Sequence, residues 1–227
     1  MVQVKICGIT EHTALAAAMQ AGADFIGLVF YPPSPRHVSL KTAARLADMA
    51  RGRVNIVALV VDADDALISD IAREVRPDYV QAHGAETPER VRRIAEMAQC
   101  AVIKAFRLKQ QKDLQQVEPY APHMAFALLD AWHDPQQAAL PGGMGKAFDW
   151  RWLAQWAGRQ RPFMLAGGLT PENVAEAIRL TGAPMVDVSS GVERARGVKD
   201  AEKIRRFIAA AKGADRERTG HHEHGAS

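Results

Sequence analysis

Val4-Lys5-Ile6-Cys7-Gly8-Ile9-Thr10 is an apolar run that carries a lysine and a cysteine at alternate positions and ends on glycine. Residues two apart on a β-strand share a face, so we expect Lys5 and Cys7 to point the same way, with Cys7 at the carboxyl end of the strand. A thiol at such a position is either a base or nucleophile, or an inert buried side chain. The rest of the chain must decide between these interpretations.

Similar apolar runs recur along the chain, separated by segments with the 3.6-residue periodicity of amphipathic helices. The predicted strands cover residues 2–7, 24–30, 54–61, 79–83, 101–106, 125–130, 163–166 and 185–189. Helix starts are predicted where a capping oxygen precedes the helix, at Ser39 and Asp149, and where it also precedes proline, at Thr87-Pro88 and Thr170-Pro171. The chain is therefore predicted to alternate strand and helix throughout.

Eight strands alternating with eight helices predict a parallel sheet joined by right-handed crossovers. At 227 residues the expected closure is a single (β/α)8 TIM barrel, and the alternative is an open doubly wound sheet. We expect the barrel domain to span residues 1–212. Residues 213–227 are rich in glycine and charge and lack an apolar stripe, which predicts a disordered tail. The histidines at 221–224 lack a scaffold, and no metal site is expected.

Charge and composition limit the partners. The formal charge is +3 and the pI about 9.0, but the basic residues are dispersed among acids, which argues against nucleic acid and suits an anionic ligand. Cys7 and Cys100 have no metal or disulfide spacing. No leader and no run of membrane-spanning length is evident, so the cytoplasm is the expected location, with no membrane partner.

Titratable or glycine-rich residues recur where the predicted strands end, which in such barrels is where function lies. These positions are Cys7, Tyr31 with the loop to His37, Asp62, His83-Gly84, Arg107, Asp130, Gly167-Gly168 and Ser189-Ser190-Gly191. Their recurrence at one end of the barrel favours an enzyme over a plain scaffold.

The glycine loops after the last two strands predict a phosphate site, because glycine lets the backbone approach a ligand and free N–H groups bind anions. They are Ala166-Gly167-Gly168-Leu169-Thr170-Pro171 and Ser189-Ser190-Gly191-Val192-Glu193. The alternative is that the paired glycines only form a tight turn. A further loop, Pro141-Gly142-Gly143-Met144-Gly145-Lys146, lacks the spacing of a P-loop.

Several side chains have two possible roles. Asp130 is either a cap or an acid that faces Cys7 across the barrel. Arg36, in a proline-rich loop, is either a surface charge or a carboxylate clamp, and His83 is either a ligand-facing donor or a satisfied histidine. Lys5 needs a partner if it points inward, and Asp187 is expected to supply it because the last strand of a closed barrel lies beside the first.

Six motifs, in register from residue 4 to about 208, carry a family resemblance. They are Lys5-Ile6-Cys7-Gly8-Ile9-Thr10, Phe30 with Ser34-Pro35-Arg36, Gln81-Ala82-His83-Gly84, Gly142-Gly143-Met144-Gly145-Lys146-Ala147-Phe148-Asp149-Trp150, Ala166-Gly167-Gly168-Leu169 and Asp187-Val188-Ser189-Ser190-Gly191-Val192-Glu193. Together they resemble the phosphoribosylanthranilate isomerases of tryptophan biosynthesis. The chain departs from that pattern at Ala82, Met144 and Ala147, where the family commonly has leucine and hydroxyl residues.

The resemblance implies a cofactor-free enzyme that rearranges N-(5'-phosphoribosyl)anthranilate, as a monomer or homodimer. Cys7 falls at the family's general-base position, Asp130 at its general-acid position and Arg36 at its carboxylate site. Gly168, Ser190 and Gly191 fall in its phosphate loops. The full set expected to contact substrate is Arg36, His83, Gly143, Gly167, Gly168, Asp187, Ser189, Ser190 and Gly191.

Rival functions remain open at this stage. Ribulose-phosphate epimerase would require a constellation of histidine and aspartate metal ligands, and the aminoaldose isomerase of histidine synthesis would require aspartate where Cys7 stands. Indole-glycerol-phosphate synthase would require lysine and glutamate catalysts. A non-catalytic module that binds phosphate or nucleic acid is supported only by the pI.

Overall fold

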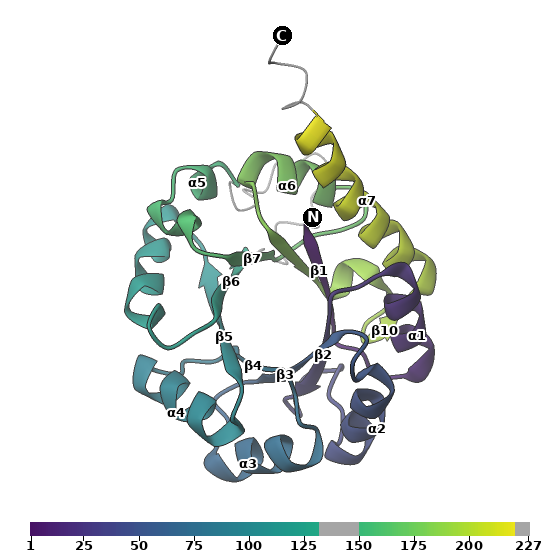
Figure 1. Cartoon of the computed structure of the whole chain (residues 1–227), viewed down its shortest axis with the longest axis vertical. Coiled ribbons are helices and arrows are strands. Elements are labelled where there is room, and N and C mark those ends of the chain that lie inside the picture. Colours follow the sequence, from purple (N-terminus) through teal and green to yellow (C-terminus); the bar gives the residue numbers. More distant parts are fainter. Residues whose placement is uncertain (132–149, 221–227) are drawn as a thin grey trace.

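The computed structural model describes residues 1–131 and 150–220 and contains a closed barrel of eight parallel strands (Figure 1). The strands are β1 (Gln3–Cys7), β2 (Phe25–Phe30), β3 (Asn55–Val60), β4 (Tyr79–Ala82), β5 (Ala101–Leu108), β6 (Phe126–Ala131), β7 (Phe163–Ala166) and β8 (Met185–Val188). The first strand pairs with both the second and the last: Lys5 is in register with Phe25 on one side and with Asp187 on the other. The prediction of a closed barrel is confirmed, and the open sheet is excluded.

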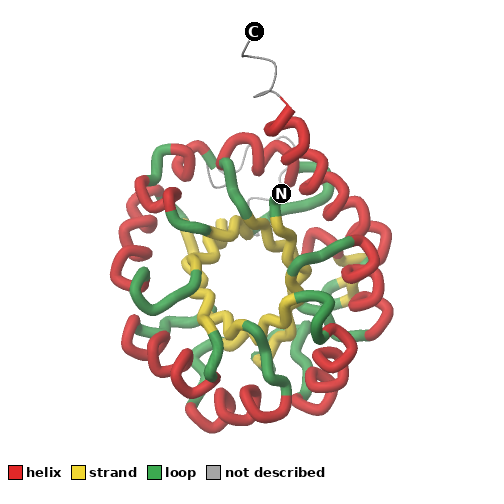
Figure 2. The backbone as a smooth tube through the Cα atoms, viewed as in Figure 1, coloured by secondary structure: helices red, strands yellow, loops and turns green. Residues whose placement is uncertain are grey.

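Helices form a ring outside the strands (Figure 2). Those in the described part of the chain are α1 (His12–Ala21), α2 (Leu40–Ala50), α3 (Asp65–Glu74), α4 (Pro88–Ala98), α5 (Arg151–Ala154), α6 (Val174–Thr181) and α7 (Ala201–Gly220). The order within residues 1–131 and 150–220 is completed by three 3₁₀ segments and two short strands. They are η1 (Gln111–Tyr120), η2 (Ala157–Gln160), η3 (Ser190–Val192), β9 (Glu193–Ala195) and β10 (Val198–Lys199).

The ring departs from regular alternation after β5, where η1 takes the place of an α-helix. Pro119 lies inside η1 and has no N–H to donate, so it cannot contribute to α-helical bonding. After β6, α5 is only four residues long. A sequence pattern that marks a helical segment does not by itself distinguish these shorter forms from a full α-helix.

Two of the predicted helix starts are confirmed. The Ser39 side chain accepts from the amide of Thr42, and Thr87 caps α4 with Pro88 in its first turn. The start predicted at Thr170-Pro171 is wrong, because α6 begins at Val174. Asn173 accepts a 2.8 Å hydrogen bond from the Thr170 amide and stabilises a turn there instead. The cap predicted at Asp149 lies outside the described residues.

The carboxyl-terminal boundary also differs from the prediction. Residues 213–220 were expected in a disordered tail but continue α7, which ends at Gly220. The apolar stripe that contains Phe207 and Ala211 extends to Ala214, which is 3% exposed, and this burial explains why the helix passes residue 213. The histidines at 221–224 lie outside the described residues.

The core has two layers that leave the carboxyl end of the barrel free. Outward-facing strand residues pack against the helices, while inward-facing ones fill the barrel. Phe25, Tyr79 and Phe126, the first residues of β2, β4 and β6, meet with ring centroids 5.8–6.3 Å apart and fill the amino end. The opposite end is therefore the one open to ligands.

Among the described helices, none combines the length and the apolar character that a membrane span requires.

Candidate active site

A cavity of about 690 Å³ lies at the carboxyl end of the barrel, where the sequence predicts function. It is formed by the ends of the strands and the loops that follow them. Of the eleven residues predicted for the site, ten line it: Cys7, Arg36, His83, Asp130, Gly167, Gly168, Asp187, Ser189, Ser190 and Gly191. The eleventh, Gly143, lies outside the described residues.

Cys7 and Asp130 face this cavity from two non-adjacent strands, at the ends of β1 and β6. Cys7 is 4% exposed, whereas Asp130 is only partly buried. Burial raises the pKa of the Cys7 thiol above its ordinary value, although the positive charge of Lys5 opposes the change. Two groups that can exchange protons thus share one small volume.

Lys5 is fully buried on the same face as Cys7, one layer deeper. Its ammonium donates a 2.9 Å hydrogen bond to Oδ1 of Asp187, as predicted. Burial alone would lower the pKa of Lys5, but attraction to Asp187 and Cys7 outweighs it, and the pKa is raised. Lys5 therefore places a positive charge beside the thiol.

Gly27 on β2 makes room for this group. A Cβ built at Gly27 would lie 2.8 Å from Sγ of Cys7 and 3.3 Å from Nζ of Lys5. Since real Cβ atoms do not approach other atoms to 2.8 Å, any side chain here would displace the thiol. A glycine inside a strand commonly marks such a close approach.

Arg36 lies at the rim of the cavity and is held by Glu193. Its Nε and one terminal nitrogen donate hydrogen bonds of 2.6 and 2.8 Å to the two oxygens of that carboxylate. Lys199 donates to Glu193 as well, at 3.0 Å, and to the backbone oxygen of Ser189 at 2.9 Å. Burial opposes ionisation of Glu193, but the hydrogen bonds from Arg36 and the attraction to Lys199 outweigh it and lower the pKa to about 2. The guanidinium is thus fixed along one edge, and its remaining N–H groups are left for other acceptors.

His83 contacts Asp130. Its Nε2 lies 3.5 Å from Oδ2 of Asp130, and its Nδ1 lies 2.8 Å from Nε2 of Gln81. Gln81 is completely buried. The His83 ring is therefore not free in the cavity, and its contacts are with side chains and not with the backbone. It links the buried amide of Gln81 to the carboxyl group of Asp130.

The two glycine loops lie against each other beside Cys7. Gly167 and Gly168 both have positive φ, at 88° and 63°, which only glycine adopts readily. A Cβ at Gly191 would lie 1.9 Å from the backbone oxygen of Leu169, so the loop after β8 packs directly onto the loop after β7. Their backbones form one continuous wall of the cavity.

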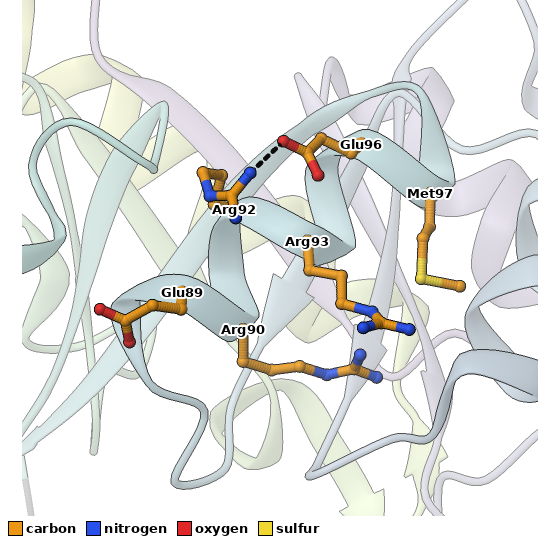
Figure 3. Close-up of a pocket in the computed structure, with 6 residues that line it drawn as sticks. All are labelled: Glu89, Arg90, Arg92, Arg93, Glu96 and Met97. Atoms are coloured by element: carbon orange, nitrogen blue, oxygen red, sulfur yellow. Dashed lines mark hydrogen bonds and ion pairs between the residues drawn. The ribbon is translucent and has the colours of Figure 1, made fainter.

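A separate hollow on the outer surface of α4 is also lined by charged side chains, but most of these are paired with one another or with α3 (Figure 3). Arg92 pairs with Glu96, while Arg90 and Arg93 both bind Asp65 on α3. These ion pairs tie two neighbouring helices together and account for the charges. In the described part of the chain no group of three or more histidine, cysteine or acidic side chains is arranged to hold a metal ion.

Four residues of the site are not predicted from the sequence: Gln81, Gly27, Glu193 and Lys199. Two signals were available: Gln81 is two residues before His83 and so shares its face, and Gly27 is a lone glycine inside an apolar strand. The contact of Glu193 with Arg36 spans 157 positions, and no local pattern marks it.

Comparisons with known proteins agree with this arrangement. A family model described as N-(5'-phosphoribosyl)anthranilate isomerase matches residues 4–210. A relative of that name from Afipia carboxidovorans is 53% identical over 211 residues, which cover 93% of this chain and 89% of the relative. 

Solved structures of the same enzyme are also similar to the chain. One, in complex with reduced 1-(o-carboxyphenylamino)-1-deoxyribulose 5-phosphate, is 38% identical with a TM-score of 0.81, covering 94% of this chain and 100% of the other. Monomers generated from the dimeric Thermotoga maritima enzyme are 37% identical, with a TM-score of 0.80 and the same coverage.

Proposed function

The chain belongs to the N-(5'-phosphoribosyl)anthranilate isomerase family, and on this premise we propose that Cys7 is its general base and Asp130 its general acid. The reaction is the Amadori rearrangement of N-(5'-phosphoribosyl)anthranilate to 1-(2-carboxyphenylamino)-1-deoxy-D-ribulose 5-phosphate in tryptophan biosynthesis. The observation that carries the assignment is that Cys7 and Asp130 face one cavity from two non-adjacent strands.

The two groups divide the proton transfers between them. Asp130 gives a proton to the furanose ring oxygen, the bond from that oxygen to the anomeric carbon breaks, and the anilino nitrogen lone pair forms an iminium. Cys7 takes the proton from the adjacent carbon, which gives an enolamine. The enolamine gains a proton at the former anomeric carbon and loses the proton of its hydroxyl group, which gives the ketone, so atoms and electrons balance without an external oxidant or reductant.

Binding is assigned to the rest of the cavity wall. The phosphate lies against Gly167, Gly168, Ser190 and Gly191, where the two loops present backbone N–H groups. The free edge of the Arg36 guanidinium binds the anthranilate carboxylate, for which a planar fork of donors is well suited. His83, Asp187 and Ser189 complete the contacts from the strand ends, and Gly143 is proposed from the sequence alone.

We infer a cytoplasmic enzyme that is a monomer or homodimer, binds a phosphorylated small molecule and has neither a nucleic-acid nor a membrane partner. The existence of a dimeric relative supports the homodimer, and dispersed basic residues argue against nucleic acid. Sedimentation of the purified chain distinguishes the two oligomeric states.

A direct assay tests the residue assignments. Loss of N-(5'-phosphoribosyl)anthranilate is followed by fluorescence for the wild type, Cys7→Ser and Asp130→Asn. Since general acid–base groups contribute about 10²–10⁴-fold each, both variants should lose kcat by that range while retaining the fold and phosphate binding. Near-wild-type kcat in either variant would reject that residue and redirect the search, with Asp187 the next acid to test.

A further inference from the structure

Gln81 is a fully buried amide whose position packing alone does not explain. It lies on β4, two residues before His83, so both side chains point into the barrel. Both residues line the cavity that Asp130 faces. Most of the other side chains that point into the barrel near Gln81 are apolar, whereas Gln81 is polar.

The contact between Gln81 and His83 fixes the chemistry of the imidazole. Nε2 of Gln81 lies 2.8 Å from Nδ1 of His83. An amide nitrogen only donates hydrogen bonds, so Nδ1 must accept, and the ring proton is held on Nε2. That Nε2 is the atom 3.5 Å from Oδ2 of Asp130.

The oxygen of the Gln81 amide lowers the stability of the fold. Oε1 of Gln81 is buried and has no hydrogen-bond partner among the described residues. Buried polar atoms are nearly always paired, and an unpaired one lowers stability. A leucine would fill the same space without this penalty, so stability is not the benefit that Gln81 provides.

We propose that Gln81 is a positioning residue that holds His83 as the Nε2–H tautomer and thereby orients the carboxyl group of Asp130. The proposal rests on the proposed role of Asp130 as the acid. When the complex with substrate shortens the 3.5 Å separation to a hydrogen bond, the Nε2–H donates to Oδ2, which leaves Oδ1 as the oxygen that carries the proton toward the substrate. The same hydrogen bond stabilises the carboxylate after that proton has left. Catalytic contacts that are long without substrate commonly shorten in the complex.

The tautomer is measured first, by long-range ¹H–¹⁵N NMR of the ¹⁵N-histidine-labelled full chain, with His83→Asn used to assign the signals. The wild type should show His83 protonated at Nε2 and unprotonated at Nδ1. In Gln81→Leu the two tautomers should mix, and in Gln81→Glu the proton should move to Nδ1, because a carboxylate can only accept. A wild-type ring protonated at Nδ1 would overturn the proposal.

Kinetics and stability then separate positioning from packing. Gln81→Leu should lower kcat about 10- to 100-fold, the usual loss when an orienting partner is removed, with KM changed less than about threefold. Its Tm should change little, because loss of the hydrogen bond to His83 is offset by removal of an unpaired buried atom. Gln81→Glu should also lose kcat. The control is Gln115→Leu on the exposed face of η1, which should leave kcat and Tm unchanged.

The outcomes distinguish this inference from the assignment of Asp130. Unchanged kcat in Gln81→Leu rejects the positioning role, and a lower Tm with unchanged kcat assigns Gln81 to packing. Full activity in Asp130→Asn rejects the acid instead, and the NMR result for His83 stands independently of it.

Discussion

The ammonium of Lys5 and the carboxylate of Asp187 meet at 2.9 Å across the seam where β8 closes on β1. The Lys5 side chain is completely buried and that of Asp187 is 9% exposed. The pair therefore has two roles. It joins the first strand to the last, and it places a positive charge next to Cys7.

Removal of one partner of this pair should lower the free energy of unfolding. Lys5→Met leaves the Asp187 carboxylate buried without its counter-ion, so we expect the free energy of unfolding to fall by about 3–5 kcal/mol. Urea denaturation measures this loss. The matched control is Glu202→Gln, which breaks an exposed pair with Arg205 on α7 and should cost less than about 1 kcal/mol. Equal losses for the two variants would show that the buried pair contributes no more than a surface pair.

Glu193 should determine how well Arg36 binds substrate. Glu193→Gln keeps the shape of the side chain but removes the charge that fixes the guanidinium, so KM should rise with a smaller effect on kcat. Arg36→Lys should raise KM more, because an ammonium cannot contact both Glu193 and a carboxylate with a planar fork. Steady-state kinetics test both, and unchanged KM in Arg36→Lys would remove Arg36 from the substrate site.

The same contact predicts how stability depends on pH. The pKa of Glu193 is lowered from 4.5 to about 2 in the folded chain, so its contribution is complete above pH 4.5 and is lost as the pH falls toward 2. The wild type should therefore exceed Glu193→Gln in stability at pH 6, and the difference should shrink between pH 4.5 and 2. A difference that is constant over this range would show that ionisation of Glu193 is not its source.

Whether a feature of the fold or the site could be predicted from the sequence depends on how far apart in the chain the interacting residues lie. Alternation of apolar runs and helical periodicity predicted the barrel, and barrel closure predicted the Lys5–Asp187 pair, because each follows from local pattern plus one topological rule. The partner of Arg36 could not be predicted in this way. Glu193 approaches it through the β9–β10 hairpin, whose Gly197 packs on the backbone oxygen of Pro35.

Gly27 should be required for activity although it carries no functional group. In Gly27→Ala the new Cβ would lie 2.8 Å from Sγ of Cys7, which forces the thiol to move. A misplacement of about 1 Å can cost roughly 10²-fold in rate, so kcat should fall by about that factor. Gly213→Ala on α7 is the control, because no described atom outside the adjoining helix backbone lies within 4 Å of its added carbon. Wild-type kcat in Gly27→Ala would show that the added carbon does not displace the Cys7 thiol from its working position.

Gly191→Ala tests the loop contact that forms the proposed phosphate site. Its Cβ would lie 1.9 Å from the backbone oxygen of Leu169, so the loops after β7 and β8 must separate. We expect KM for the substrate and the inhibition constant for inorganic phosphate to rise together, while Gly213→Ala changes neither. If KM rose but inhibition by phosphate did not weaken, the phosphate group would have to bind elsewhere.

The pH dependence of the rate tests Cys7 as the base. Burial raises the pKa of the thiol above its ordinary value, so the thiolate is a small fraction of the free enzyme at neutral pH. Because kcat/KM reports the free enzyme, the residual kcat/KM of Asp130→Asn, in which ionisation of the acid no longer contributes, should increase about tenfold per pH unit above neutrality until the thiol ionises. The positively charged iminium favours the thiolate, so the corresponding limb of kcat should lie at lower pH.

Two variants make this assignment specific to Cys7. In Lys5→Met the limb should move to higher pH, because the cation that favours the thiolate is gone. In a Cys100→Ser background, where Cys7 is the remaining cysteine of the chain, the rate of inactivation by iodoacetamide should follow the same limb as kcat/KM of Asp130→Asn, and bound product should slow it. Inactivation that follows a different pH dependence from kcat/KM of Asp130→Asn would assign the base to another group.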